Sequence, residues 1–311
     1  MRMIQLGITD LIVSRICFGC WQLSPKFWGE VPLEPWHAAL LAALDEGVNF
    51  IDTADAYGDG HAETALGDFL AREKLRDRFV LATKFYWNLE GARRYPDTSH
   101  DYILRACEAS LRRLKTDRID LYQIHAWDPL TIPEEVGAAL QRLRHEGKVR
   151  WFGVSNLKAE QMRLYRRCFP VHCLQPCYNM LTRGCEAAEL PYCLDHRIGV
   201  IAYSPLERGL LTGKYAPGHQ FTDSRKDHPM FQPEARQRTM AALDKLRPMA
   251  DEQGLTLPQF AIRWVLTHPA LTAAIVGIKT PEHVRSIVKA ADDVLSGQMW
   301  HAAAGIMHKA G

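Results

Sequence analysis

The chain has 311 residues, 47% of them hydrophobic, and a formal net charge of +2. That much apolar sequence can build one large core, while a near-neutral charge without a basic stripe argues against a nucleic-acid partner. No apolar stretch reaches the roughly 18 residues that a membrane span needs, and the first residues lack the apolar core of a signal peptide. The expected protein is therefore cytoplasmic, with its eight scattered cysteines reduced.

Short apolar runs alternate along the chain with segments of helical spacing, such as the stripe Ile103, Cys107, Leu111 and Leu114. The predicted strands are 16–19, 49–52, 79–84, 119–125, 151–155, 174–178, 200–203 and 274–277. Strands that are apolar throughout are typical of parallel sheets covered on both faces. Eight strands alternating with helices favour an α/β fold, a (β/α)8 TIM barrel, as a single domain over residues 1–311.

Two segments depart from this alternation. The runs 3–5 and 11–13 flank a short turn, which predicts an N-terminal β-hairpin that caps the bottom of the barrel. The segment 206–231 is polar and rich in glycine and proline. Loops of this length in a compact domain are usually functional, often as a lid.

Four residues that can move or stabilise a proton lie at or just after three successive predicted strands: Asp52, Tyr57, Lys84 and His125. Barrel active sites form at the C-terminal ends of the strands, so we expect these side chains to meet. An ammonium at Lys84 would lower the pKa of Tyr57, Asp52 would pair with Lys84, and His125 would donate to a carbonyl oxygen. Such a set can protonate an oxygen on which negative charge develops, as carbonyl reduction by hydride requires.

Each of the four residues also has a purely structural interpretation. Asp52 could cap a turn, Tyr57 could be a partly buried loop residue, and Lys84 could end a strand in solvent. An isolated buried histidine such as His125 is more often a satisfied core residue than a catalyst. Their joint occurrence at three successive strand ends favours the chemical interpretation.

The sequence resembles the aldo-keto reductase family over nearly its whole length, most closely in the segments 50–58, 111–125, 147–156 and 201–215. Within the family it is most similar to the bacterial branch of inositol-operon and general-stress reductases, which is related to potassium-channel β subunits. The resemblance implies a barrel that binds NADP(H) without a Rossmann fold. It makes Tyr57 the general acid or base, tuned by Lys84 and Asp52, with His125 orienting the substrate carbonyl.

The resemblance also implies a cofactor site. Ser155, Asn156 and Gln175 would surround the nicotinamide carboxamide, to which hydroxyl and amide groups are suited, and Tyr203 would stack on the ring. The residues facing the phosphates would be Ser204, Leu206, Gly209, Leu211 and Lys214. Arg225 either closes over the pyrophosphate or is a solvated surface arginine, and the sequence leaves both interpretations open.

The last cofactor segment contains Gly277, Lys279 and His283. Lys279 would pair with the 2′-phosphate of NADP as a point charge. Ser286 and Ile287 stand where relatives carry an acidic residue followed by Asn, which weakens adenine recognition. NADP is therefore the expected cofactor, with NAD as the alternative.

The substrate pocket is expected to be lined by tryptophans that follow strands, namely Trp21, Trp28, Trp87 and Trp127. Aromatic walls favour sugars or apolar and aromatic carbonyl compounds, although one or two of these side chains could simply pack loops together. No metal is expected, because the cluster Cys168, His172, Cys173 and Cys177 lacks the paired spacing of zinc knuckles.

The leading hypothesis is an NADP-dependent oxidoreductase that reduces an aldehyde or ketone. The same residues would serve the reverse reaction, oxidation of a sugar or polyol hydroxyl, with Tyr57 as the base. A cofactor-sensing regulatory subunit with little turnover is the alternative from another class. The expected partner is a small carbonyl or sugar substrate, and the sequence leaves the substrate's identity, the direction and the oligomeric state open.

Overall fold

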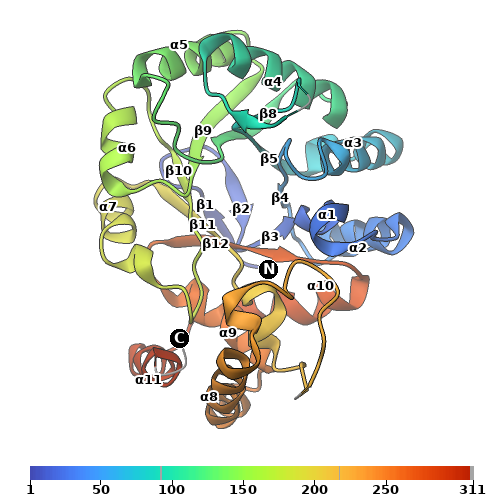
Figure 1. Ribbon diagram of the computed structural model, residues 1–311, viewed down its shortest axis with the longest axis vertical. Helices are drawn as coiled ribbons and strands as arrows, with labels where there is room; N and C mark the ends of the chain where they lie inside the picture. Colours follow the sequence, from blue (N-terminus) through green and yellow to red (C-terminus); the bar gives the residue numbers. More distant parts are fainter. Residues whose placement is uncertain (92, 217, 309–311) are drawn as a thin grey trace.

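The computed structural model describes residues 1–91, 93–216 and 218–308 and contains a closed barrel of parallel strands (Figure 1). Around the barrel the strands run in the order β10, β11, β12, β3, β4, β5, β8 and β9. Their bounds are β3 (Ile16–Gly19), β4 (Phe50–Asp52), β5 (Val80–Phe85), β8 (Ile119–Ile124), β9 (Val149–Ser155), β10 (Cys173–Gln175), β11 (Gly199–Tyr203) and β12 (Leu271–Gly277). Each predicted run overlaps one of these strands, so the predicted (β/α)8 barrel is confirmed.

Helices surround the barrel and follow the strands in turn (Figure 1). They are α2 (Leu33–Asp45), α3 (His61–Glu73), α4 (His100–Leu114), α5 (Pro133–His145), α6 (Ala159–Tyr165), α7 (Glu189–Asp195), α9 (Leu257–Thr267) and α10 (Pro281–Ile287). Three more helices lie outside this repeat: α1 (Pro25–Trp28), α8 (Pro233–Glu252) and α11 (Gly297–His308). Among the described residues no helix is long and apolar enough to cross a membrane.

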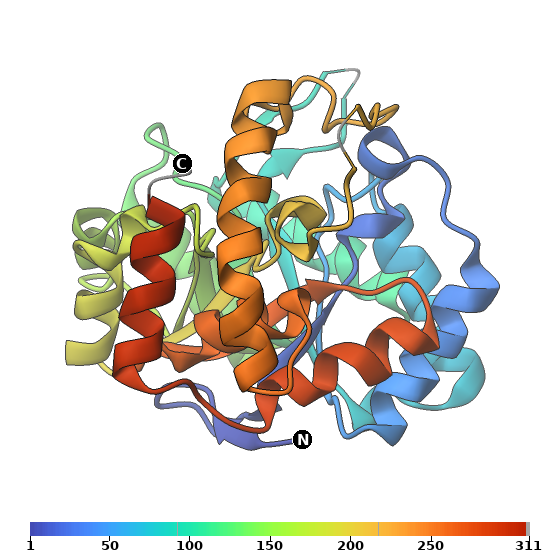
Figure 2. The same cartoon turned by 90° about the horizontal axis from the view of Figure 1, so that it is seen from below.

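The bottom of the barrel is closed by an antiparallel hairpin of β1 (Met3–Gln5) and β2 (Ile12–Ser14), as predicted. Figure 2 shows this hairpin at one end of the molecule and the chain around residues 218–230 at the other. Leu6, Leu11 and Val13 pack with apolar side chains from the barrel interior. The hairpin therefore plugs the end of the barrel opposite the C-terminal ends of the strands.

Inside the barrel, a polar layer lies directly above an apolar one. The lower layer includes Phe50, Ala82, Leu121, Cys173 and Ile201. Two residues further along the same strands stand Asp52, Lys84, Gln123, Gln175 and Tyr203. Because side chains two apart in a strand point to the same face, both sets face the barrel axis. The strand period thus places the polar residues together at the C-terminal ends of the strands.

The segment 206–231 is packed rather than extended into solvent. It contains the short 3-10 helices η4 (Glu207–Thr212) and η5 (Pro229–Phe231), and Tyr215 and Phe231 belong to a small hydrophobic cluster of their own. The backbone N–H of Ser224 donates to the carbonyl oxygen of Phe27 in α1 at 3.4 Å. The segment therefore reaches across to the loop that follows β3.

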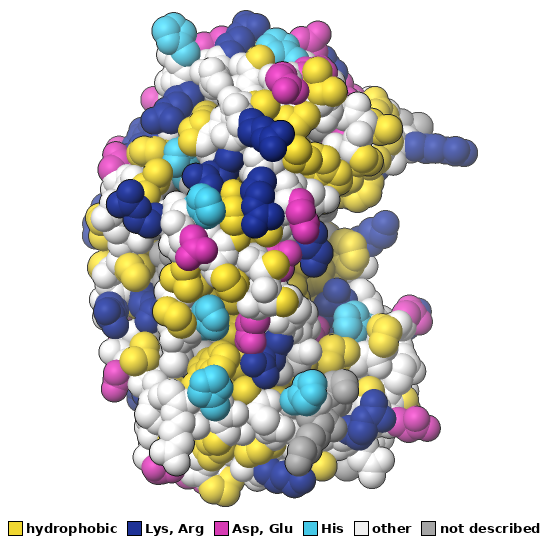
Figure 3. Space-filling view, turned by 90° about the vertical axis from the view of Figure 1, so that its left-hand side faces the viewer, with side chains coloured by type: hydrophobic (Ala, Val, Ile, Leu, Met, Phe, Trp, Pro, Cys, Tyr) yellow, Lys and Arg dark blue, Asp and Glu magenta, His cyan; other side chains and the backbone are white. Residues whose placement is uncertain are grey.

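On the side of the molecule that carries α6 and α7, the described residues carry charges of both signs. Figure 3 shows Lys and Arg side chains interspersed with Asp and Glu over this face, with hydrophobic side chains between them. This mixture matches the small net charge of the chain.

Gly67 of α3 lies where α3 packs closely against the last residues of α4. Its Cβ, if present, would lie 2.2 Å from the carbonyl oxygen of Arg113 and 2.6 Å from the carbonyl carbon of Leu114. We expect Gly67→Ala to lower the free energy of unfolding by about 1–3 kcal/mol, measured by urea denaturation, because the helices must separate.

The matched control is Gly305→Ala in α11, where a Cβ would have no neighbour within 4 Å. It should raise stability by up to about 1 kcal/mol, because alanine is the better helix former. A Gly67→Ala protein as stable as the control would contradict the close approach.

Candidate active site

Lys84 is the centre of the polar layer. Its Nζ donates to Asp52 Oδ1 at 2.6 Å, to the carbonyl oxygen of Thr53 at 2.8 Å and to the hydroxyl of Tyr57 at 3.1 Å. Lys84 is fully buried and Asp52 nearly so. All three ammonium hydrogens thus have acceptors, and the buried charge has a counterion.

Tyr57 is held in its protonated form. Burial raises the pKa of Tyr57 and the charge of Asp52 adds to this, while Lys84 acts in the opposite direction. The net shift of the Tyr57 pKa is upward, although Lys84 alone is expected to lower it. Burial of the hydroxyl has a larger effect on this pKa than the Lys84 ammonium. Burial also lowers the pKa of Lys84, but Asp52 and Tyr57 reverse this and the net pKa is raised. At neutral pH the pair is therefore a neutral phenol beside an ammonium.

His125 follows β8 and faces Tyr57. The two ring centroids are 5.9 Å apart, with the rings nearly perpendicular at 77°. Burial and, after it, the charge of Lys84 lower the pKa of His125 to about 3. A neutral imidazole keeps one N–H, so His125 can donate one hydrogen bond to a substrate oxygen. The four predicted catalytic residues thus lie together.

Gln123 also belongs to this group, although its partners could not be deduced from the sequence. Its Nε2 donates to Asp52 Oδ2 at 3.1 Å, and the Nε2 of Gln175 donates to the same oxygen at 2.8 Å and to Gln123 Oε1 at 3.1 Å. The available signal was a polar residue within an apolar run, two positions before His125. The side-chain amides of Gln123 and Gln175 thus donate to the second carboxylate oxygen of Asp52. Gln175 still has its Oε1 atom as a hydrogen-bond acceptor.

A cavity of about 680 Å³ opens above this group. Its size falls within the roughly 300–1,000 Å³ typical of ligand pockets. It is lined by these predicted residues: Asp52, Tyr57, His125, Ser155, Asn156, Gln175, Tyr203, Ser204, Leu206, Gly209, Lys214, Arg225, Gly277, Lys279, His283, Trp21, Trp28 and Trp87. Lys84 lies beneath the floor and reaches the cavity through Tyr57.

One end of the cavity is organised by Asn156. Its Nδ2 donates to the carbonyl oxygen of His125 and to Ser155 Oγ, both at 3.1 Å, and its Oδ1 accepts from the Tyr203 hydroxyl at 2.9 Å. Ser155 Oγ in turn donates to the carbonyl oxygen of Gln175 at 2.9 Å. These amide and hydroxyl groups suit a ligand group that both donates and accepts, such as a carboxamide.

The other end of the cavity is positively charged. Burial lowers the pKa of Lys214 and of Lys279, and in both cases the next cause is the charge of Arg225. Arg225 Nε is paired with Asp223 Oδ1 at 2.9 Å, and its guanidinium lies 5.3 Å from the ring centroid of Trp28. Three cations with one carboxylate between them form a donor set that fits phosphate groups. With a side chain only 17% exposed, Arg225 lines the cavity rather than the open surface.

Two predicted contact residues lie away from the cavity. Leu211 is fully buried in the hydrophobic core, because the left-handed residues Arg208 and Gly209 turn the chain and direct Leu211 inward. Trp127 packs against Tyr165 of α6, with ring centroids 5.1 Å apart. Neither lines the cavity, and both assignments are corrected.

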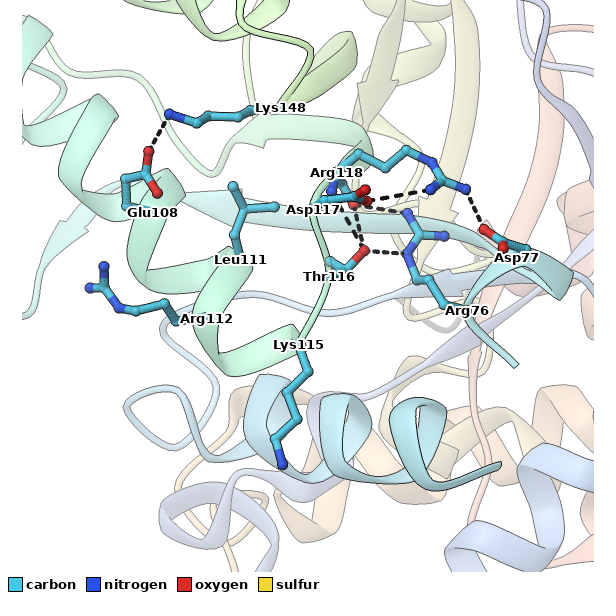
Figure 4. A pocket seen from close by; sticks show the side chains of 10 residues that line it. All are labelled: Arg76, Asp77, Glu108, Leu111, Arg112, Lys115, Thr116, Asp117, Arg118 and Lys148. Atoms are coloured by element: carbon cyan, nitrogen blue, oxygen red, sulfur yellow. Dashed lines mark hydrogen bonds and ion pairs between the residues drawn. The ribbon is translucent and has the colours of Figure 1, made fainter. Parts of the chain in front are cut away.

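A larger hollow of about 790 Å³ lies near the end of α4, at the opposite end of the barrel (Figure 4). Most of its charged side chains form ion pairs: Arg118 pairs with Asp77 at 2.5 Å, and Lys148 pairs with Glu108. No aromatic side chain is among the described residues that line this hollow, unlike the cavity above Tyr57. In the described ranges, no group of three or more His, Cys, Asp or Glu could hold a metal ion.

Comparisons with known proteins agree on one family. The model of the Aldo/keto reductase family matches residues 15–307. The chain is 35% identical over 290 residues to the aldo-keto reductase YhdN of Bacillus subtilis (strain 168), with 92% of this chain and 88% of that one covered. It is 33% identical over 316 residues to the NADH-specific methylglyoxal reductase of Escherichia coli (strain K12), with 95% of each chain covered. Its structure resembles the glycerol dehydrogenase of Gluconobacter oxydans with a TM-score of 0.89 and 35% identity, over 98% of this chain and 94% of that one.

The depressed pKa of His125 makes stability depend on pH. The pKa of His125 is about 3 in the folded protein and about 6.5 in the unfolded chain. Between these two pH values, His125 is therefore protonated only in the unfolded chain. The corresponding stability is fully present above about pH 6.5 and is lost as the pH falls toward 3. We expect His125→Asn to reduce the loss of unfolding free energy between pH 7 and pH 5, measured by urea denaturation at both values.

His301→Asn, at an exposed position of α11, is the control and should keep the wild-type loss. If His125→Asn lost as much stability on acidification as wild type, His125 would not be neutral in the folded protein.

Proposed function

The chain belongs to the aldo/keto reductase family, and on this basis we propose that it reduces an aldehyde or ketone to an alcohol with NAD(P)H, using Tyr57 as the general acid. The observation that carries the proposal is the Tyr57 hydroxyl, which lines the cavity and lies 3.1 Å from the buried ammonium of Lys84. The bacterial branch within the family remains a prediction.

In the proposed reaction, the bound cofactor supplies a hydride to the carbonyl carbon. Tyr57 gives its proton to the carbonyl oxygen as negative charge develops there. The Lys84 ammonium stabilises the phenolate that remains, and Asp52 holds Lys84 in place. His125, neutral and facing Tyr57, donates a second hydrogen bond to the same oxygen. The phenolate then regains a proton from water.

The cofactor is proposed to lie along the cavity, with its carboxamide at Ser155, Asn156 and Gln175 and its ring on Tyr203. Its phosphates would lie along the segment 204–214 and beneath Arg225. The excess of positive charge around Lys214 and Lys279 supports NADP as the preferred cofactor. NAD stays the alternative, and one relative is named as NADH-specific.

The substrate is proposed to be a small carbonyl compound or sugar held against Trp21, Trp28 and Trp87. The reverse reaction, dehydrogenation of a polyol, is the second candidate, and the likeness to a glycerol dehydrogenase favours it. The raised pKa of Tyr57 supports reduction at neutral pH, because the phenol then holds the proton it must donate. Dehydrogenation needs the phenolate and would be favoured at high pH.

Tyr57→Phe tests the assignment of the acid. We expect it to lower the rate of NADPH-dependent methylglyoxal reduction, and of NADP-dependent glycerol oxidation at high pH, by about 10²–10⁴-fold. Cofactor affinity should stay within about twofold, because the ring remains and only the hydroxyl is lost. The matched control is Tyr165→Phe, which removes a buried hydroxyl without a hydrogen-bond partner in the described structure. Wild-type rates in Tyr57→Phe would exclude it as the acid.

Lys279→Ala tests the cofactor preference. We expect the mutant to bind NADPH about tenfold more weakly, as followed by tryptophan fluorescence, because one charged contact to phosphate is lost. NADH affinity should change little. Lys289→Ala, which removes an exposed lysine nearby in the sequence, should leave both affinities unchanged. Equal or tighter binding of NADH by wild type, unaffected by Lys279→Ala, would contradict the assignment.

A further inference from the structure

The segment that follows β11 contains an unusual run of backbone conformations. Ser204, Glu207 and Arg208 have positive φ angles of 54°, 44° and 52°, and Gly209 continues at 92°. Left-handed conformations are unfavourable for residues other than glycine and persist only where the surroundings impose them. Ser204, Leu206, Arg208 and Gly209 line the cavity. Something outside the segment must therefore hold it in this shape.

Asn179, in the turn after β10, holds this run at its start and its middle. It is fully buried, and its Nδ2 donates to the carbonyl oxygen of Ser204 at 2.9 Å and to Glu207 Oε2 at 2.8 Å. Its Oδ1 accepts from the backbone N–H groups of Leu181 and Thr182 at 2.8 and 2.9 Å. One side-chain amide thus joins the start and the middle of the strained run to an ordered turn.

Glu207 completes the connection from the other side. Its carboxylate is buried, and Oε2 also accepts from Thr182 Oγ1 at 3.2 Å. Neither Glu207 nor Asn179 lines the cavity, whereas Arg208 does and places its guanidinium 5.4 Å from the ring centroid of Trp21. A buried carboxylate needs hydrogen-bond donors. The bonds that Glu207 accepts from Asn179 and Thr182 therefore fix the backbone that carries Arg208 and Gly209.

We propose that Asn179 and Glu207 are positioning residues that hold the segment 204–209 in its cofactor-binding shape before the cofactor arrives. The inference rests on the proposed function, since it takes this segment as the wall facing the cofactor phosphates. A preformed wall lowers the ordering cost of binding. Because neither residue faces the cavity, their loss acts on the affinity for both cofactors and leaves the chemical step intact.

The test compares Glu207→Met with Glu207→Gln. Both remove the charge and keep the length of the side chain, but only Gln retains an oxygen that can accept from Asn179 and Thr182. We expect Glu207→Met to bind both NADPH and NADH at least about tenfold more weakly than Glu207→Gln, as followed by tryptophan fluorescence. The kcat at saturating cofactor should agree between the two within about twofold. Asn179→Ala should weaken binding similarly, and its effect should not add to that of Glu207→Met.

Hydrogen–deuterium exchange of the cofactor-free protein gives the second readout. In Glu207→Met, exchange should become faster in peptides covering 204–213 and stay at the wild-type rate elsewhere. Equal affinities and equal exchange in Met and Gln variants would overturn the proposal. Faster exchange throughout the protein would also overturn it, since the role would then be general stability. Faster local exchange with unchanged affinity would show that the segment does not face the cofactor.

Failure of the proposed function gives a different pattern. If wild type bound neither NADPH nor NADH, the function proposed above would fail, whereas the exchange comparison would still report whether Asn179 and Glu207 fasten the segment.

Discussion

The buried ammonium of Lys84 is the constraint on which the candidate site depends. Removing one partner of a buried ion pair typically costs about 3–5 kcal/mol, whereas exposed pairs such as Arg72 with Glu73 contribute about 0–1 kcal/mol. Lys84 therefore requires Asp52, and Asp52 requires donors for its other oxygen, which Gln123 and Gln175 supply. The other two hydrogens of the ammonium are directed to the carbonyl oxygen of Thr53 and to Tyr57. One buried charge thus accounts for Asp52, Gln123 and Gln175 in the polar layer.

The same arrangement explains why the upper barrel is suited to proton transfer. The apolar layer below, with Phe50 and Leu121, excludes water from beneath the pair, so the interaction between Lys84 and Tyr57 is strengthened by a low local dielectric. Burial keeps Tyr57 protonated and His125 neutral. In the proposed reaction, Tyr57 and His125 would donate two hydrogen bonds to one oxygen, and the ammonium lies beside the hydroxyl that would become the phenolate.

Loops around the barrel end complete the site by bringing tryptophans and cations together. Arg225 and Lys279 lie 5.3 and 6.0 Å from the ring centroid of Trp28. These loops are longer and less regular than the strands, so their shape depends on hydrogen bonds between segments. The bonds of Asn179 to Ser204 and Glu207 are the clearest case.

By itself, the sequence determined the barrel and the group of proton-handling residues. Apolar runs and amphipathic segments are local patterns, and a residue at the end of a strand such as Asp52 or Lys84 is visible in its own segment. Only the tertiary structure decided the direction of the Tyr57 pKa shift, the hydrogen-bond partners of Gln123 and Asn179, the burial of Leu211 and the position of Arg225 at the cavity. These depend on burial and on partners distant in the chain: Gln175 and Asp52, for example, are 123 positions apart. No local pattern specifies such a pair, because it forms only when the barrel closes.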